Sequence, residues 1–138
     1  MVGDGRALVG VPTTDQAVQA RVRQTAWSPT GTAERWAGVL ARYKDASNYY
    51  YLHLRSGGTV SLRKLVNGAI TELASAPLAV SLHTEYTLRL EVVGTQLRGF
   101  VNGNLVVQTT DGSLTAGSGG LMTSKASAQF DDYLAYQP

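Results

Sequence analysis

The residues that carry the most chemistry in this sequence lie in one run, Asn48-Tyr-Tyr-Tyr-Leu-His-Leu-Arg55. A β-strand sends alternate side chains to opposite faces, so this run divides into two sets. One set predicts a core face: Tyr50, Leu52 and Leu54. The other set places rings and polar groups on the opposite face: Tyr49, Tyr51, His53 and Arg55. Rings stack on the C–H faces of sugars and polar groups bond sugar hydroxyls, so the second set predicts a carbohydrate-binding wall. The alternative is an ordinary amphipathic sheet surface.

Two further arginines join this wall if the neighbouring strands pair as hairpins. Arg42 has the same parity as Trp36 on the preceding segment, and Arg63 follows the tight Gly57-Gly58 turn. We therefore expect Arg42, Arg55 and Arg63 to lie close together. Guanidinium groups bind carboxylates in a bidentate manner, which favours an acidic glycan, whereas the alternative is a solvated rim of charges. Trp36 itself is either a sugar platform or a large core residue.

The carboxylates do not form a catalytic pattern. Glycosidases need two of them on either side of the scissile bond, whereas Glu91 stands alone on its strand. Asp131 and Asp132 are adjacent, so a regular strand points them to opposite faces. The two histidines, His53 and His83, are far apart in the sequence. We predict that the chain is not an enzyme, with a divergent lyase or hydrolase as the alternative.

Short alternating segments separated by turn signals must position these residues. Asn-Gly and Gly-Gly pairs favour tight hairpins, because glycine adopts a positive φ without a steric clash. No segment keeps a helical period. Strands are expected at 6–11, 17–27, 35–44, 49–55, 59–66, 70–75, 87–93, 97–102, 105–110, 120–124 and 128–136. This spacing predicts an all-β, two-sheet antiparallel sandwich with little or no helix.

The composition is that of a single globular domain spanning residues 1–138. The chain has 43% hydrophobic residues, no cysteine and a net charge of +2. The absence of cysteine excludes disulfides and thiolate metal sites. Neither a basic run nor a long apolar run is present, so we expect neither nucleic acid nor membrane as a partner.

Four stretches in order, "WAGVLARYKDASNYYYLHLR", "LRKLVNG", "YTLRLEVVGTQLRGFVNG" and "GGLMTSKASAQFDDY", resemble the concanavalin A-like, laminin G-like jelly-roll modules of secreted bacterial polysaccharide-degrading enzymes, those of pectate lyases above all. The resemblance implies a jelly roll and a carbohydrate-related role. The family's first strand has no counterpart here, so we expect a domain excised from a larger enzyme. Its loss would expose an edge beside residues 128–136 and invite self-association.

The same resemblance implies a structural calcium ion near the end of the chain. Calcium takes six to eight oxygen ligands, of which Asp131 and Asp132 are the candidates. The alternative is an acidic pair that caps a turn or pairs with arginine.

These observations together predict an extracellular, non-catalytic carbohydrate-binding module of a polysaccharide-degrading enzyme, with acidic glycans such as pectin as ligands. A structural accessory domain that packs on a catalytic domain and binds no sugar is the alternative.

Overall fold

The alternating segments of the sequence form ten strands in the computed structural model, which describes residues 3–29 and 35–138. The strands are β1 (Gly3–Thr13), β2 (Gln16–Trp27), β3 (Trp36–Asp45), β4 (Asn48–Arg55), β5 (Thr59–Val66), β6 (Ala69–Pro77), β7 (Glu85–Val93), β8 (Gln96–Val101), β9 (Asn104–Thr110) and β10 (Gly117–Tyr136). No helix occurs in these two ranges, so the all-β prediction is confirmed. The described residues accordingly contain no helix that could cross a membrane.

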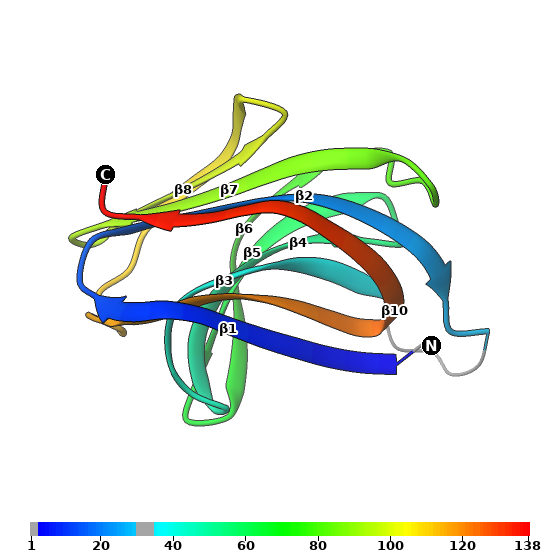
Figure 1. The fold of residues 1–138 in the computed structure, drawn as a ribbon. Coiled ribbons are helices and arrows are strands. Elements are labelled where there is room, and N and C mark those ends of the chain that lie inside the picture. Colours follow the sequence, from blue (N-terminus) through cyan, green and yellow to red (C-terminus); the bar gives the residue numbers. More distant parts are fainter. Residues whose placement is uncertain (1–2, 30–34) are drawn as a thin grey trace.

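The strands make one continuous antiparallel sheet that folds over into two layers (Figure 1). The first layer has the order β6-β5-β4-β3-β10-β1, and the second has the order β10-β2-β7-β8-β9. Strand β10 belongs to both layers. In Figure 1 the second layer lies above the first, and the lower surface of the first layer faces away from it. The predicted two-sheet jelly-roll sandwich is confirmed.

Strand β10 differs from the prediction, which placed separate strands at 120–124 and 128–136. A single strand runs from Gly117 to Tyr136 and bends near Lys125, whose φ is 52°. Its first part pairs with β1 and β3, and its second part pairs with β2. Within the described residues, the part from Ser127 onward has no strand on the edge opposite β2.

The core lies between the two layers. It is built mainly from Val, Leu and Ala side chains that alternate with outward-facing residues along each strand. Tyr50, Leu52 and Leu54 of β4 all point into it and are fully buried, as the parity of the run predicts. Leu88 and Leu90 of β7 meet them from the second layer. This core fixes the register of the first layer and thereby what its other face presents.

Candidate functional site

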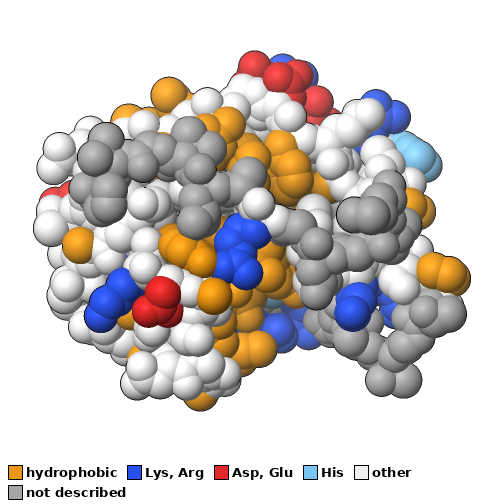
Figure 2. Space-filling model, turned by 60° about the horizontal axis from the view of Figure 1, so that its bottom comes forward, with side chains coloured by type: hydrophobic (Ala, Val, Ile, Leu, Met, Phe, Trp, Pro, Cys, Tyr) orange, Lys and Arg blue, Asp and Glu red, His pale blue; other side chains and the backbone are white. Residues whose placement is uncertain are grey.

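The face of the first layer that points away from the core carries a second cluster of buried residues. We call it the outer-face cluster and define it by the following residues: Trp36, Leu40, Tyr43, Tyr49, Tyr51, Leu65 and Met122. Cross-strand pairing assembles it, because Tyr51 of β4 lies opposite Leu40 of β3 and Arg63 of β5. Figure 2, which brings the bottom of Figure 1 forward, shows hydrophobic side chains gathered in the middle of one face with Lys and Arg side chains among them.

The rings of the cluster and of His53 form an unbroken row of contacts. Tyr51 stacks on the His53 ring at 4.6 Å between centroids and on Trp36 at 5.2 Å. Tyr51 also meets Tyr49 at 5.4 Å, and Tyr49 stacks on Tyr43 at 5.4 Å. Such contacts hold the rings in one arrangement. The row therefore makes a stiff floor beneath whatever lies on this face.

A glycine allows the close approach on which this floor depends. Gly38 of β3 lies directly opposite His53 of β4. A Cβ atom at Gly38 would lie 2.1 Å from the carbonyl oxygen of Leu52 and 2.7 Å from the Cβ of His53. No side chain fits there, so the imidazole packs against the backbone of β3 and contacts the Trp36 ring at 4.7 Å.

The predicted wall of exposed rings is not open. Tyr49, Tyr51 and His53 retain only 5%, 3% and 0% of their exposure. A sugar on this face would therefore meet little free ring surface, and mainly the polar groups at the margin. The parity prediction is confirmed for these residues, whereas their role in binding stays a prediction.

Two arginines at the margin share one carboxylate. The Nη1 atom of Arg55 lies 3.3 Å from Oε1 of Glu72 and donates to Oγ of Ser61 at 2.9 Å. The Nε atom of Arg63 lies 3.4 Å from the same Glu72 oxygen. Burial by itself raises the pKa of the Glu72 carboxyl, but the hydrogen bond from Ser61 and the two guanidinium groups outweigh it and lower the pKa. Arg55, Glu72 and Arg63, which we call the Arg55–Glu72–Arg63 array, therefore place fixed hydrogen-bond donors beside an ionised acceptor.

His53 lies beneath these charges without a hydrogen-bond partner in the described residues at either ring nitrogen. Burial, followed by the nearby charges of Arg63 and Arg55, holds the pKa of His53 well below its ordinary value. The imidazole is therefore neutral at physiological pH. A buried polar group without a partner costs stability, and such groups are uncommon in native structures. The ring is held instead by its contacts with the rings of Tyr51 and Trp36.

Arg42 does not lie beside Arg55 and Arg63, so that prediction is wrong. The pairing of β3 with β4 shifts between Ala41 and Asp45, and Arg42 has a φ of 48° in this bulge. A bulge changes the direction in which the following side chains point. Arg42 is 2% exposed and turns to the end of the sandwich, and Tyr43 takes its place on the outer face.

The Arg42 guanidinium binds loop carbonyls at that end instead. It donates to the carbonyl oxygens of Thr14, Gly94 and Leu114 at 2.8, 2.8 and 3.0 Å. Its Nη2 atom lies 3.7 Å from a carboxylate oxygen of Asp15. Arg42 therefore ties three loops together. The sequence missed Tyr43 as a member of the outer face, because nothing in the residue types signals a positive φ at an arginine.

The proposed calcium ligands have other partners. Oδ2 of Asp132 accepts from Nη1 of Arg21 at 2.6 Å, and Oδ1 of Asp131 accepts from the N–H of Asp132 at 2.9 Å. The Arg21 guanidinium therefore occupies the position beside the Asp132 carboxylate that a calcium ion would need. No group of three or more acidic, His or Cys side chains that could hold a metal ion occurs in the described ranges. These residues do not fit a shell of six to eight oxygens, and calcium binding stays a prediction.

Comparison with known proteins bears on the fold. The sequence matches no protein-family model and no curated protein. A carbohydrate-binding module, CBM66, from Bacillus subtilis has a TM-score of 0.85, with 22% identity over 98% of this chain and 83% of its own. Sheep galectin-11 in complex with glycerol has a TM-score of 0.63, with 11% identity over 99% of both chains. The chain therefore has the jelly-roll fold of these two proteins.

The same jelly roll also occurs inside a larger protein. The GH43 protein BlXynB from Bacillus licheniformis matches with a TM-score of 0.69 and 16% identity. The match covers 91% of this chain and 28% of BlXynB. The fold implied by the sequence resemblance is thereby confirmed. At these identities the likeness extends to the fold, and function has to be argued from the site.

Proposed function

We propose that this chain is a non-catalytic carbohydrate-binding module that holds a secreted polysaccharide-degrading enzyme near its substrate. One observation carries the proposal: a rigid aromatic floor on the face away from the core, with the Arg55–Glu72–Arg63 array at its margin and the unpartnered His53 beneath it. Fixed donors and an acceptor side by side suit neighbouring sugar hydroxyls. The parent enzyme, a lyase or a hydrolase, and the extracellular location rest on the sequence resemblance.

The charge of this face favours an acidic glycan such as pectin. Arg55 and Arg63 both lie beside the carboxylate of Glu72. Arg6 adds a further guanidinium to this face, which lies 5.3 Å from the centre of the Tyr43 ring and donates to the Tyr43 hydroxyl. An excess of fixed positive charge attracts carboxylates.

Catalysis at this face is disfavoured by the state of Glu72. A general acid in glycoside hydrolysis needs a raised pKa, whereas Ser61 and two arginines hold the pKa of Glu72 down. Self-association through the edge of β10 stays a prediction.

A structural accessory role is the second candidate, and the burial of Tyr49 and Tyr51 favours it. In that role the outer face would pack on a catalytic domain. Half-buried Tyr43, Leu65 and Met122 would then form the contact.

Affinity gel electrophoresis on polygalacturonate, xylan and fructan separates the two roles. We expect polygalacturonate to retard the protein and Arg63→Gln to abolish the retardation. Arg89→Gln is the matched control, because Arg89 pairs with Glu91 on the second layer. A protein that no glycan retards would overturn the binding proposal. If Arg63→Gln and Arg89→Gln lose retardation equally, the glycan does not bind at Arg63.

A further inference from the structure

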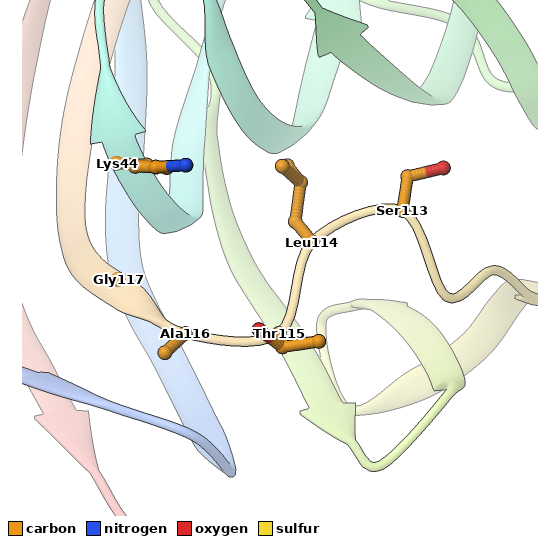
Figure 3. Close-up of a pocket in the computed structure, with 6 residues that line it drawn as sticks. All are labelled: Lys44, Ser113, Leu114, Thr115, Ala116 and Gly117. Atoms are coloured by element: carbon orange, nitrogen blue, oxygen red, sulfur yellow. The ribbon is translucent and has the colours of Figure 1, made fainter.

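A hollow of about 340 Å³ lies between the end of β3 and the loop that joins β9 to β10. It shares no lining residue with the outer-face cluster. Figure 3 shows the Lys44 side chain directed toward Leu114 across the opening, with Ser113, Thr115, Ala116 and Gly117 along the loop. Small-molecule sites have volumes of roughly 300–1,000 Å³, so this hollow suits a ligand of about one sugar ring.

The loop wall of the hollow is fixed by side chains from β3 and β4. The N–H of Leu114 donates to the Tyr50 hydroxyl at 3.2 Å, and its carbonyl accepts from Nη1 of Arg42 at 3.0 Å. The Tyr50 hydroxyl donates in turn to Oδ1 of Asp111 at 2.7 Å. The N–H of Ser113 donates to the same oxygen at 2.9 Å. Both backbone groups of Leu114 are thus held from the interior.

A third strand and a glycine complete the wall. Nζ of Lys64 in β5 donates to Oδ2 of Asp111 at 2.7 Å and to Oγ of Ser113 at 2.9 Å. A Cβ atom at Gly117 would lie 2.3 Å from the carbonyl carbon of Arg42, so only glycine lets the loop reach β3 this closely. A wall held in this way needs no ordering when a ligand enters, which favours binding.

The charges around the hollow favour an anion. The Lys44 amino group has no hydrogen-bond or ion-pair partner in the described part of the chain, whereas Lys64 is paired with Asp111. The neighbouring carboxylate of Asp45 accepts hydrogen bonds from the turn that follows it. The charge of Lys44 also acts on this carboxylate, as the smallest of the influences that lower the pKa of Asp45, but Lys44 makes no ion pair with it in the described residues. An ammonium group and a carboxylate form a charge-assisted hydrogen bond.

The remaining lining groups add sugar-like chemistry. Ser113 and Thr115 bring hydroxyl groups, and Leu114 and Ala116 bring apolar surface. Hydroxyls bond sugar hydroxyls, and apolar surface covers the C–H face of a sugar ring. A free anion would use the cation alone, whereas a carboxylated sugar would use all three kinds of group.

We propose that this hollow is a second saccharide site that takes a single uronic acid residue, whose carboxylate pairs with Lys44 and whose hydroxyls bond Ser113 and Thr115. The proposal goes beyond glycan binding at the outer face, because the two sites share no side chain. The residue is either a free uronic acid or the end of a polyuronate chain.

Titrations followed by amide chemical shifts of ¹⁵N-labelled protein test the site with three probes. We expect D-galacturonate to shift the amides of Lys44 and of residues 113–117 in a saturable manner. D-galactose lacks the carboxylate and acetate lacks the ring, so each should bind about tenfold more weakly or worse. Trigalacturonate distinguishes the two sources, since it shifts the same amides if a chain end is accepted. Absence of galacturonate shifts at these amides, or equal shifts with galactose, would overturn the proposal.

Variants keep this test separate from the outer face. Lys44→Gln should weaken galacturonate binding by about tenfold or more, whereas Lys125→Gln removes a lysine elsewhere and should not. Arg63→Gln should leave the galacturonate shifts unchanged, even where it abolishes retardation by the polymer. If Lys44→Gln and Lys125→Gln behave alike, the hollow is not the site. If the polymer fails to retard the protein while galacturonate still shifts residues 113–117, the outer-face proposal fails alone.

Discussion

Strands β3 and β4 build two buried clusters on opposite faces, and their compositions differ. The core side of β4 supplies Leu52 and Leu54 to a mainly aliphatic cluster, while the other side supplies Tyr49 and Tyr51 to an aromatic one. The core leaves few polar atoms to satisfy. The outer-face cluster instead contacts the His53 imidazole, which has no hydrogen-bond partner in the described residues, and lies beside the array of Arg55, Glu72 and Arg63. Equal burial therefore does not require an equal role: the first cluster joins the two layers, whereas glycan binding at the second is our proposal.

The largest loss of stability is expected in the core. Leu52→Ala removes a fully buried side chain that touches Gly99 of the second layer, where an added Cβ would lie 2.7 Å from a Leu52 methyl carbon. The free energy of unfolding should fall by ~2–5 kcal/mol, as urea denaturation would measure. Under conditions in which the variant is folded, retardation by polygalacturonate should be unchanged. If folded Leu52→Ala loses retardation by polygalacturonate, the core cluster affects glycan binding as well as stability, which would contradict the separate roles of the two clusters.

Two adjacent tyrosines, Tyr50 and Tyr51, allow a matched pair of substitutions with smaller expected losses of stability. Tyr50→Phe removes a hydroxyl that bonds Asp111 and the Leu114 N–H, which leaves buried groups unsatisfied and should cost ~1–3 kcal/mol. Tyr51→Phe keeps the stacked ring and should cost less than ~1 kcal/mol. Thermal unfolding of the two variants measures the difference. A larger loss of stability in Tyr51→Phe than in Tyr50→Phe would contradict the different roles of the two faces of β4.

His53, beside the outer-face cluster, should also make the free energy of unfolding depend on pH between pH 7 and 5. The pKa of His53 is lowered on folding from its ordinary value of 6.5, so the unfolded chain binds the proton more readily. The stability contributed by neutral His53 is thus complete above pH 6.5 and falls below it, by up to about 1.4 kcal/mol per pH unit. His53→Phe should flatten this decline, measured by urea denaturation at several pH values. If stability falls with pH in His53→Phe as it does in the unsubstituted protein, groups other than His53 cause the decline.

The smallest effect on stability is expected at the margin. Arg63→Gln breaks a partly exposed ion pair with Glu72 at 3.4 Å and should change the free energy of unfolding by only ~0–1 kcal/mol. Urea denaturation of Arg63→Gln and of the control Arg89→Gln measures this change in the free energy of unfolding. A large loss in Arg63→Gln alone would mean that the margin supports the fold and that loss of retardation says little about binding.

Strand parity predicted much of this arrangement, because the side-chain period of a strand depends on nothing outside it. It placed Tyr50 in the core and Tyr51 on the other face. It failed at Arg42, where a bulge with a positive φ breaks the period. It also divided β10 in two at residues 125–127, where the strand bends at Lys125, with a φ of 52°, but does not end.

Burial of the rings could not be read from parity. The contact of Tyr51 with Trp36 depends on how β3 aligns with β4, and its contact with Tyr49 depends on how two side chains of β4 turn toward each other. The array around Glu72 likewise depends on the register of β5 with β6, which shifts between Leu62 and Arg63. The sequence thus predicts which face a residue occupies more readily than how far that residue is exposed.

Glycan binding at the outer face of the first layer is tested most directly by a map of amide chemical shifts on ¹⁵N-labelled protein titrated with trigalacturonate. We expect saturable shifts at Tyr51, His53, Arg55, Arg63 and Glu72, which Arg63→Gln abolishes and Arg89→Gln leaves in place. Shifts confined to β2, β7 and β8, or to residues 113–117, would contradict the assignment of glycan binding to the outer face of the first layer.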